Sequence, residues 1–553
     1  MKIVLQYKGV IFMGMNTKKR SFVLLGCFLL LLSCYSFSQQ VHQWNRFEVA
    51  IKHAYSGNNF TEVKLTAIFT HKDTSYTVDG FYDGDNTFKI RFIPEKTGTW
   101  QYITSSNIKQ LNNKKGSFEC VTANGTNHGI VRVSNTYGFK YADGKQYYPV
   151  GTTAYAWNHM GKQLQQTTLQ TLKNSAFNKL RMCVFPKDYN LVKEEPEIYP
   201  FIAKDTAKDA AGKTIKVWDL STFNTEFFAV LEKQVEALDA LGIEADLILF
   251  HPYDKGRWGF DSLPMDVNLR YIKYIVARLG AFHNVWWSIA NEWDLVKYKT
   301  HDEWITLSKA VSKADPYHHL LSIHGSTAKY IEYWLPEFTH ISVQDEGPVM
   351  NGGGAVILRN VYNKPIIYDE VGYEGNLASR WGRYSPEEMT YLMWMGAIGG
   401  TYVTHGESYM FKDGTDTIFW AKGGTFKGTS WKRAGFLKKI MEEAPGPLEP
   451  SDVSRDFKTA SGGSGHYIIY FGKEINENWF FNLPQRNASF GRLLPAKKYK
   501  VEIIDTWDMT ITPVAGVFET DQVEDYRLYD KQRKKIWLPL KPYLALRIIE
   551  IAK

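Results

Sequence analysis

The pattern of apolar and polar positions changes its character twice along the chain. Between about residues 41 and 123, short β-like runs alternate with turns such as Asp83-Gly84 and Thr97-Gly98, which is typical of antiparallel strands. From about residue 149 to 444, strand-like and helix-like segments follow one another, and after the proline-rich stretch Pro445–Pro450 the short strands return. The sequence therefore predicts an α/β region between two β-rich regions.

The first and last regions contain only short strands. In the first region we predict strands at Arg46–Lys52, Glu62–Lys72, Thr74–Phe81, Thr87–Pro94, Thr99–Ser105 and Gly116–Thr122. In the last region we predict them at His466–Phe471, Trp479–Leu483, Lys498–Thr506, Lys535–Leu540 and Tyr543–Ile551. Neither region contains a convincing catalytic cluster, so both are predicted to be supporting β-sandwiches. A sugar-contacting role for the loop Asp505–Asp508 is the alternative for the last region.

The central region alternates strands with helices. Its strand-like segments are Pro149–Thr153, Lys179–Phe185, Ala245–Phe250, Val285–Ala290, Leu320–Ile323, His340–Val343, Pro365–Tyr368 and Gly400–Thr404. Its clearest helix-like segments are Thr225–Leu241, Met265–Leu279, Asp302–Lys313 and Pro386–Met395. Eight β/α units over roughly 300 residues predict a (β/α)8 TIM barrel. A doubly wound sheet is the alternative, but no glycine-rich phosphate loop follows any of the strands.

One connection in this barrel is long, running from Lys187 to Phe223. Long loops at the active face of a barrel usually shape access of the substrate, which favours a pocket and exo action. An insertion without function is the alternative.

The fourth predicted strand, Val285–Ala290, lacks polar alternation and is therefore expected to be covered on both faces. It ends in Asn291 and Glu292, at the end of a barrel strand where catalytic side chains are found. The seventh strand runs into Asp369 and Glu370, which would face Glu292 across the barrel mouth. Two carboxyl groups about 5–5.5 Å apart perform retaining glycoside hydrolysis. The alternative is that Glu292 caps the next helix or pairs with a surface lysine.

These two strand ends resemble a known group of enzymes. Ser288–Glu292 and Ile367–Glu370 resemble the acid/base and nucleophile motifs of the clan-A glycoside hydrolases. Within that clan, Tyr148–Tyr155, Trp218–Ser221 and Leu241–Asp246 resemble the apiosidase-like bacterial proteins, which carry a small N-terminal β domain and a C-terminal β domain. The resemblance covers nearly the whole chain after its N-terminal segment.

The resemblance implies a role for each matching residue. Glu292 would be the general acid/base and Glu370 the nucleophile. Asn291 would hydrogen-bond the sugar hydroxyl beside the anomeric carbon, and Arg181 would keep the nucleophile ionised, since a nearby cation lowers a carboxyl pKa. As alternatives, Arg181 could balance a buried acid and Asn291 could cap a helix.

One strand departs from the clan pattern. The clan commonly places an aromatic hydroxyl or a histidine on strand six against the nucleophile, whereas this strand ends in Gln344, Asp345 and Glu346. Asp345 or Glu346 could therefore compete with Glu370 for its role, and Asp369 is a further rival.

Other polar and aromatic side chains follow the predicted strands and are predicted as a group to contact the substrate. They are Trp157, Asn158, His251, Trp293, His324, Gln344, His405, Glu407 and Trp420. A metal bound by the histidines at 251, 324 and 405 is an alternative, but their spacing does not support it. No cofactor is therefore predicted.

Composition adds two constraints. Aromatic residues make up 15% of the chain, which suits sugar-binding clefts and equally suits aromatic β-domain cores. The mean hydropathy of -0.33 indicates a soluble globular protein. The formal net charge is +8, but residues 1–38 hold five basic and no acidic residues, so the remainder is nearly neutral. No basic run resembles a nucleic-acid-binding surface.

The N-terminus has the layout of an export signal. A basic stretch, Lys18–Arg20, precedes the apolar run Val23–Leu32 and then small residues. Cleavage is expected after Ser38, and a lipidated Cys34 is the alternative. The remaining cysteines, Cys120 and Cys183, fall in different predicted domains and indicate neither a disulfide framework nor a zinc site.

The sequence thus predicts four segments: a signal peptide (1–38), an N-terminal β-sandwich (39–126), a catalytic barrel (127–445) and a C-terminal β-sandwich (446–553). The predicted function is an exported, periplasmic or secreted retaining glycoside hydrolase, exo-acting on plant or algal polysaccharide or its oligosaccharides. The alternative is a non-catalytic carbohydrate- or matrix-binding, collagen-binding-like protein on a barrel scaffold. The two differ in whether Glu292 and Glu370 meet in one pocket.

Overall fold

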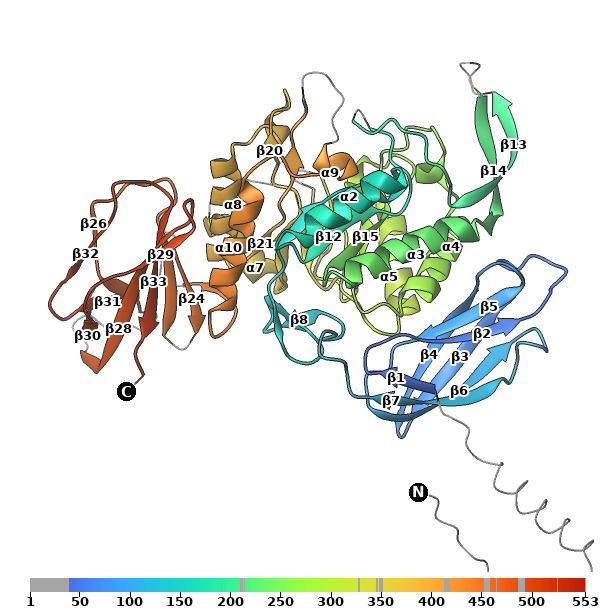
Figure 1. The fold of residues 1–553 in the computed structure, drawn as a ribbon, viewed down its shortest axis with the longest axis horizontal. Coiled ribbons are helices and arrows are strands. Elements are labelled where there is room, and N and C mark those ends of the chain that lie inside the picture. The colour runs from blue at the N-terminus through green and yellow to red at the C-terminus, as the bar shows by residue number, and fades with distance from the viewer. Residues whose placement is uncertain are drawn as a thin grey trace, which may run out of the picture.

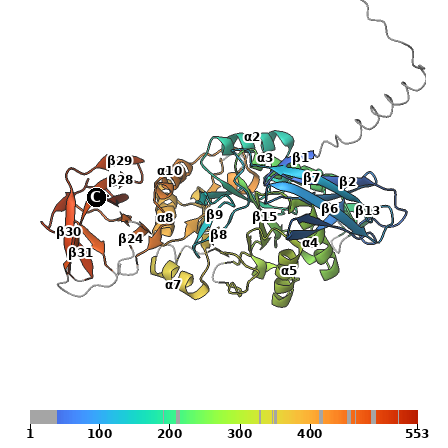
Figure 2. The same ribbon diagram turned by 90° about the horizontal axis from the view of Figure 1, so that it is seen from below.

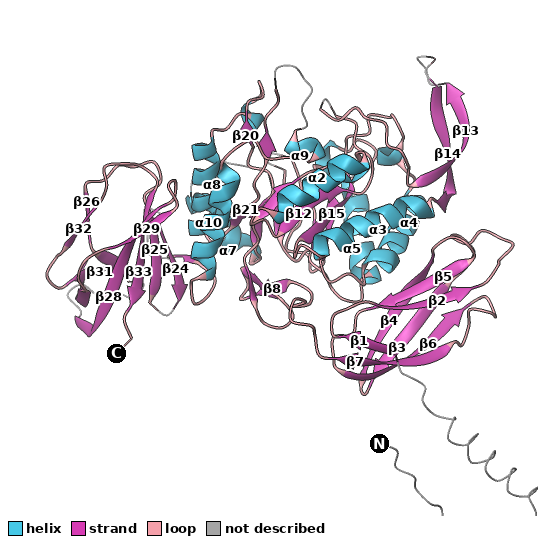
Figure 3. Ribbon diagram, in the orientation of Figure 1, coloured by secondary structure: helices cyan, strands magenta, loops and turns pink. Residues whose placement is uncertain are grey.

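The computed structural model describes residues 39–189, 191–208, 212, 214–326, 329–344, 347, 352–411, 418–451, 458–463, 465–485, 493–524 and 526–552. The predicted signal segment with Cys34, and the rivals Asp345 and Glu346, lie outside these residues. The molecule is elongated, with a β-rich region on each side of a central α/β region (Figures 1 and 2). Its described helices belong to the central region (Figure 3).

The N-terminal region is a seven-stranded sheet around an aromatic core. Its strands are β1 (Gln39–His42), β2 (Phe47–Lys52), β3 (Leu65–His71), β4 (Thr74–Tyr82), β5 (Thr87–Phe92), β6 (Gly98–Ser106) and β7 (Lys115–Val121), in the order β1-β7-β6-β3-β4-β5-β2. Phe69 stacks on Phe92 and Phe47 stacks on Phe118, with ring centroids 4.3 and 4.0 Å apart. All six predicted strands are present, and β1 is an addition that pairs with β7 in parallel.

A small three-stranded sheet leads into the central region. It contains β8 (Arg132–Ser134), β9 (Gly138–Lys140) and β10 (Gln146–Tyr147).

The central region is built on parallel strands. They are β11 (Gly151–Thr153), β12 (Lys179–Cys183), β15 (Glu244–Phe250), β16 (Val285–Ala290), β17 (Leu321–Ser322), β18 (Ile341–Val343), β19 (Ile366–Tyr368) and β21 (Tyr402–Val403). Each predicted strand segment overlaps one of them. The first five form one sheet in chain order, and the last three form another. A parallel bridge between His324 and Ser342 joins the two sheets, and a second, between Thr152 and His405, joins the last strand to the first.

Helices follow most of these strands and surround them (Figure 1). They are α2 (Lys162–Lys173), α3 (Thr225–Asp239), α4 (Met265–Leu279), α5 (His301–Ala314), α7 (Gly352–Tyr362), α8 (Pro386–Ile398), α9 (Phe419–Lys422) and α10 (Ser430–Glu442). Short 3₁₀ helices lie at η1 (Trp157–His159), η2 (Phe260–Ser262), η3 (Trp293–Leu295) and η4 (Arg380–Gly382). Capping boxes at Thr300 and Ser385 fix where α5 and α8 begin. Two short strands, β20 (Glu374–Gly375) and β22 (Glu407–Ser408), pair beside the central strands.

The long connection after β12 is not only a loop. It contains β13 (Phe201–Lys208) and β14 (Thr214–Phe223), an antiparallel hairpin that projects from the body of the molecule (Figure 1). The alternation Thr214-Ile215-Lys216-Val217 in β14 is a strand pattern that the sequence analysis missed.

Most described strands of the C-terminal region form one large sheet. These strands are β23 (Glu449–Pro450), β24 (Thr459–Gly463), β25 (His466–Tyr470), β27 (Asn482–Pro484), β28 (Leu493–Asp505), β29 (Thr510–Pro513), β30 (Phe518–Glu524), β31 (Arg527–Asp530) and β33 (Leu544–Glu550). A separate two-stranded ribbon pairs β26 (Asn478–Phe480) with β32 (Lys535–Trp537). Four of the five predicted strands are present as single strands, and the fifth, Trp479–Leu483, is divided between β26 and β27, which belong to different sheets.

Both flanking regions dock on the central helices through charged and aromatic contacts. On one side Arg91 forms an ion pair with Glu232 at 2.7 Å. On the other side the guanidinium of Arg433 lies 3.4 Å from the ring centroid of Trp507, and its Nε donates to the Trp507 carbonyl oxygen. The Asp505–Asp508 loop is therefore part of a domain contact, as expected for a supporting module. No helix among the described residues is long and apolar enough to cross a membrane.

Candidate active site

Glu292 follows β16 in a strained backbone conformation. Its φ of 48° and ψ of 55° lie in the left-handed region, which non-glycine residues seldom occupy and which is frequent at functional sites. The side chain is largely buried, and its Oε2 has no hydrogen-bond partner among the described residues. Burial raises the pKa of Glu292, and the charge of Lys187 and a hydrogen bond from Gln344 oppose this rise. The side chain does not cap η3.

Glu370 follows β19 and is also largely buried. Its Oε1 accepts a short hydrogen bond from the hydroxyl of Tyr155, which lies just after β11. Burial raises the pKa of Glu370 to about 8, and a hydrogen bond with Tyr373 lowers it. An aromatic hydroxyl thus contacts Glu370, but it follows the first central strand and not the sixth, where the clan pattern would place it.

Two tyrosines connect the surroundings of the two glutamates. The Tyr155 hydroxyl that contacts Glu370 also lies 3.5 Å from Oδ1 of Asn291, the residue before Glu292. The negative charges of Glu292 and Glu370 both raise the pKa of Tyr373, after the larger effect of its burial. Residues 78 positions apart in the chain therefore border one tyrosine cluster.

Arg181 on β12 does not contact Glu370 in the way we predicted. Its Nη1 forms an ion pair with Asp369 Oδ2 at 2.7 Å, and its Nη2 donates to Asn291 Oδ1 at 3.0 Å. Arg181 therefore balances a buried acid, which is the alternative to its predicted role of keeping the nucleophile Glu370 ionised. The reason is geometric, because adjacent residues at a strand end point in different directions. Arg181 thus orients Asn291, whose Nδ2 has no partner among the described residues.

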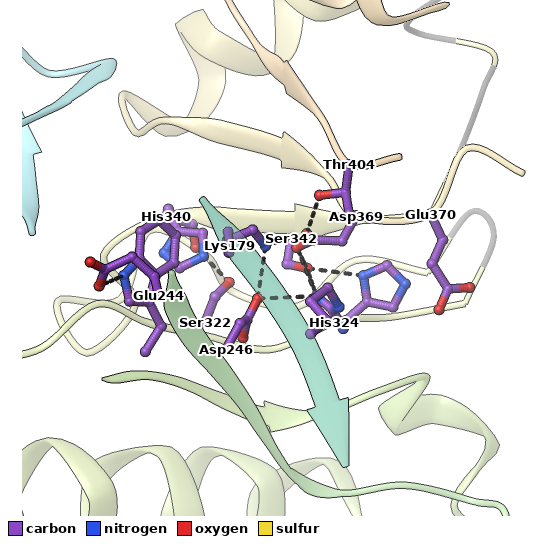
Figure 4. Close-up of polar contacts among 12 residues, drawn as sticks. Lys179, Glu244, Asp246, Ser322, His324, His340, Ser342, Asp369, Glu370 and Thr404 are labelled. Atoms are coloured by element: carbon purple, nitrogen blue, oxygen red, sulfur yellow. Dashed lines mark hydrogen bonds and ion pairs between the residues drawn. The ribbon is translucent and has the colours of Figure 1, made fainter. Parts of the chain in front are cut away.

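Asp369 is fully enclosed by a polar network (Figure 4). Besides Arg181, it contacts Lys179 Nζ at 2.7 Å, Thr404 Oγ1 at 2.8 Å and Ser342 Oγ at 2.5 Å. Burial would raise the pKa of Asp369, but the charges of Arg181 and Lys179 outweigh it and hold the pKa well below its usual range. A carboxylate with every oxygen engaged and no exposure is a poor nucleophile, which disfavours Asp369 as the rival of Glu370.

Lys187, at the start of the long connection, lies in an aromatic cage beside Glu292. The rings are those of Tyr155, Tyr189, Tyr253 and Trp420, with centroids 4.0 to 5.2 Å from Nζ. Burial lowers the pKa of Lys187 to about 8, and the charge of Glu292 is among the effects that raise it. Among the described residues no carboxylate forms an ion pair with Lys187, and the ring faces hold this cation.

Three of the predicted substrate contacts lie beside these residues with polar atoms still available. Three of their polar atoms are buried and have no hydrogen-bond partner among the described residues: Gln344 Oε1, His324 Nε2 and Trp420 Nε1. Gln344 lies close enough to act on the pKa of both Glu292 and His324. The His324 ring lies between Ser342 and Glu370 in Figure 4. The Trp293 Nε1 atom is likewise buried and unpaired within the described chain.

Other predicted contacts are occupied by the protein itself. His251 donates from Nε2 to the Phe185 carbonyl oxygen and accepts at Nδ1 from the Tyr253 amide. Both ring nitrogens of His405 contact hydroxyls, those of Thr152 and Ser430.

The prediction that Glu407 and the residues of η1 contact the substrate is corrected in the same way. Both Glu407 oxygens accept backbone N–H groups, from Lys427 and Gly428, and burial raises its pKa to about 7. Trp157 is fully buried and donates to Met182 Sδ, and Asn158 donates to the Cys183 carbonyl oxygen. These side chains support the site and are not free to bind a sugar, except through the unpaired Asn158 Oδ1.

Sequence reasoning missed several residues of the site: Tyr155, Lys179, Lys187, Asp246, Ser342, Tyr373 and Thr404. One signal for them existed, because charged residues at 179 and 181 in an otherwise apolar strand must meet buried acids. Their partners, Asp246 and Asp369, sit at strand positions that pattern alone could not pair. Within the described chain no three His, Cys, Asp or Glu side chains cluster as a metal site would require.

Comparison with known proteins identifies the family of this chain. The model of the family "Apiosidase-like, catalytic domain" matches residues 134–446, more than half of the chain. The chain belongs to the apiosidase-like family. Models of two domains of unknown function, DUF5060 and DUF5605, match residues 40–107 and 456–549 of this apiosidase-like protein. No curated protein matches the chain.

Solved structures agree with this family. The crystal structure of a candidate glycoside hydrolase from Bacteroides vulgatus ATCC 8482 is 52% identical, covers 93% of this chain and 100% of its own, and has a TM-score of 0.89. Two distant structures share the fold. One is called a glycoside hydrolase (13% identity, TM-score 0.52, 76% of this chain and 97% of that one). The other is a glycoside hydrolase of family 5 from Bacteroides vulgatus ATCC 8482 (12% identity, TM-score 0.53, 76% of this chain and 94% of that one). The apiosidase-like chain is a glycosidase, and its substrate is a carbohydrate.

Proposed function

We propose that this glycosidase works with retention of anomeric configuration, with Glu370 as nucleophile and Glu292 as general acid/base. The observation that carries the proposal is the Tyr155 hydroxyl, which hydrogen-bonds Glu370 and also reaches Asn291 beside Glu292. Two buried glutamates at the ends of β16 and β19, linked through Tyr155 and Asn291, support a mechanism in which one carboxyl group is the acid and the other the nucleophile.

The hydrogen bonds that the carboxyl oxygens of the two glutamates make or lack indicate which atom takes part in each step. Tyr155 occupies Glu370 Oε1, so Oε2 attacks the anomeric carbon while the glycosidic C–O bond breaks. Glu292 gives its proton to the departing oxygen from the unpaired Oε2. In the second half, Glu292 takes a proton from water, whose oxygen attacks the anomeric carbon and releases Glu370. Asn291 Nδ2 donates to the hydroxyl beside the anomeric carbon, in the orientation that Arg181 fixes.

The tyrosine hydroxyl is expected to control the pH at which Glu370 becomes active. Tyr155→Phe removes a donor to the carboxylate, worth about 1.5–3 kcal/mol for a charged group, and should therefore raise a pKa that burial already places near 8. The ionised form is the reactive one, so the acid limb of kcat/KM should move up by about one pH unit or more. At a pH below the pKa of Glu370 in both the wild type and the variant, kcat/KM of Tyr155→Phe should be roughly 10- to 100-fold lower than that of the wild type.

Tyr402→Phe is the matched control. Tyr402 is another buried tyrosine of the central strands, but its hydroxyl donates to the Tyr137 carbonyl oxygen and not to a carboxylate. Its pH profile should match the wild type. A Tyr155→Phe profile with an unmoved acid limb would contradict the role given to Tyr155.

We also propose that the eight parallel strands form a closed (β/α)8 barrel over residues 127–445, between β domains at 39–126 and 446–553. The parallel bridges at His324–Ser342 and Thr152–His405 support closure, because they lie at the two junctions between the sheets. The two glutamates would then lie at the carboxyl ends of barrel strands, where barrel enzymes act.

For the substrate, we propose a plant or algal polysaccharide or its oligosaccharides, cleaved in exo fashion by an exported enzyme. The long connection starts at the carboxyl end of β12 and so flanks the proposed mouth, which favours a pocket. The basic and apolar pattern of residues 1–38 supports export to the periplasm or medium. The mass of the N-terminal peptide in these fractions tests cleavage after Ser38 against lipidation of Cys34.

Proton NMR of the first product tests the mechanism. A panel of aryl glycosides identifies one that the enzyme cleaves, and the spectrum is followed before the product mutarotates. We expect the first sugar released to have the configuration of the substrate. Release of the opposite anomer would mean that Glu370 activates water and does not attack directly.

A further inference from the structure

The ribbon of β26 and β32 has two unlike faces. Asn478 pairs with Trp537, Trp479 with Ile536, and Phe480 with Lys535. Because paired residues of antiparallel strands share a face and neighbours alternate, Asn478, Phe480, Lys535 and Trp537 lie on one face, which we call the aromatic face. The other face carries Trp479 and Ile536.

The inner face is well packed, so the ribbon is not loosely attached. Ile536 is fully buried in the core of the C-terminal region, and Trp479 packs edge-on against Phe471 with centroids 5.2 Å apart. Backbone hydrogen bonds from Phe481 and Leu538 extend the pairing at both ends of the ribbon. The exposure of the opposite side is therefore a property of a folded ribbon.

The aromatic face leaves two large rings in solvent. Trp537 is 64% exposed and Phe480 is 47% exposed. The two are diagonal neighbours on the ribbon, at a spacing of about 7–8 Å. Aromatic side chains exposed side by side on a soluble protein mark a binding surface more often than isolated ones do. The ribbon lies at the outer edge of the C-terminal region, away from the central strands (Figures 1 and 3).

A lysine lies between the rings. Lys535 Nζ is 4.9 Å from the centroid of Phe480 and 5.8 Å from that of Trp537. Lys535 forms no ion pair within the described chain, whereas the nearby Arg533 pairs with Glu524. Lysine is depleted in the cores of protein–protein interfaces, so a cation in the middle of the patch argues against a protein partner.

We propose that the aromatic face binds a polysaccharide chain outside the catalytic site. Sugar rings present apolar C–H faces that stack on aromatic side chains, and hydroxyl groups around their edges. Phe480 and Trp537 would supply the stacking surfaces, while Lys535 and Asn478 would donate hydrogen bonds to hydroxyl or carboxylate oxygens. A polysaccharide fits because the chain is a glycosidase, for which a second contact with the polymer raises the local substrate concentration.

Affinity electrophoresis of the full chain tests this proposal. Native gels contain polygalacturonate, arabinogalactan or xyloglucan, and migration is compared with a gel lacking polysaccharide. We expect at least one polymer to retard the wild type and Trp537→Ala to weaken that binding about five- to tenfold. Phe480→Ala should weaken it less, because its ring is smaller and less exposed. Equal melting temperatures would show that the variants are folded.

Trp334→Ala is the matched control, because Trp334 is 61% exposed but lies outside the C-terminal region. It should migrate like the wild type in every gel. The proposal is overturned if no polymer retards the wild type, if Trp334→Ala and Trp537→Ala have equal effects, or if Trp537→Ala instead turns a dimer into a monomer in sedimentation. The test uses no hydrolysis, so its outcome is independent of the roles proposed for Glu292 and Glu370.

Discussion

Glu370→Ala is expected to lose roughly 10⁴-fold or more of the hydrolytic activity, because the step that forms the covalent intermediate no longer has an attacking oxygen. The cavity left by the carboxylate should admit a small anion. Adding azide to the variant with an activated aryl glycoside should therefore restore release of the aryl group and give a glycosyl azide of inverted configuration. Release of the aryl group is followed by absorbance, and the configuration of the azide by NMR.

Glu244→Gln is the control for this variant. Glu244 is a buried glutamate of the same strand system, it accepts from Trp286 Nε1, and it lies at the opposite end of the polar network from Glu370 (Figure 4). Glutamine keeps the acceptor, so activity should remain near that of the wild type. Undiminished turnover by Glu370→Ala would eliminate it as the nucleophile and return attention to Asp345 and Glu346.

Glu292→Ala is expected to produce a loss that depends on the leaving group. Substrates whose leaving oxygen needs a proton should be cleaved about 10²- to 10⁴-fold more slowly. With a dinitrophenyl glycoside, which departs without protonation, the first step should be almost as fast as in the wild type. The second step still needs a base to activate water, so the intermediate should accumulate and give a burst in absorbance.

The pH profile separates this role from simple loss of packing. Burial raises the pKa of Glu292, so the wild type should lose kcat/KM as the pH rises through that pKa and the acid becomes ionised. In Glu292→Ala this alkaline limb should disappear for the dinitrophenyl substrate. If Glu292→Ala lost the same fraction of kcat/KM for all leaving groups and kept the alkaline limb, another residue would have to donate the proton to the leaving oxygen.

The hydrophobic pattern sufficed to locate the central strands and the two glutamates. Val285–Ala290 is apolar except for Ser288 and is buried throughout, because parallel strands are covered on both faces, and the apolar run is visible in one stretch of sequence. The partners of the buried charges were not visible in this way. Arg181 pairs with Asp369 and not with Glu370, a difference of one residue that depends on how the strand end turns.

Contacts between the first and seventh strands were the least accessible to sequence reasoning. Tyr155 lies 215 positions before Glu370, and only the arrangement of the strands in space brings its hydroxyl to that carboxylate. Strand six runs into Gln344, where the clan pattern would place an aromatic hydroxyl against the nucleophile, so the sequence predicts that this hydroxyl is missing. The structure shows that its place is filled from another strand.

The polar network around Asp369 has a consequence for the sugar itself. Lys179 and Arg181 contribute two positive charges, and Asp246 and Asp369 contribute two negative ones, all nearly or fully buried. Glu370 therefore lies at one end of a buried network whose formal charges cancel (Figure 4). Each cation of this network pairs with a carboxylate, so the network adds no excess positive charge near the anomeric carbon; Lys187, in its aromatic cage, is not part of the network. The enzyme can keep an arginine to hold Asn291 in place without repelling the charge that the reaction creates.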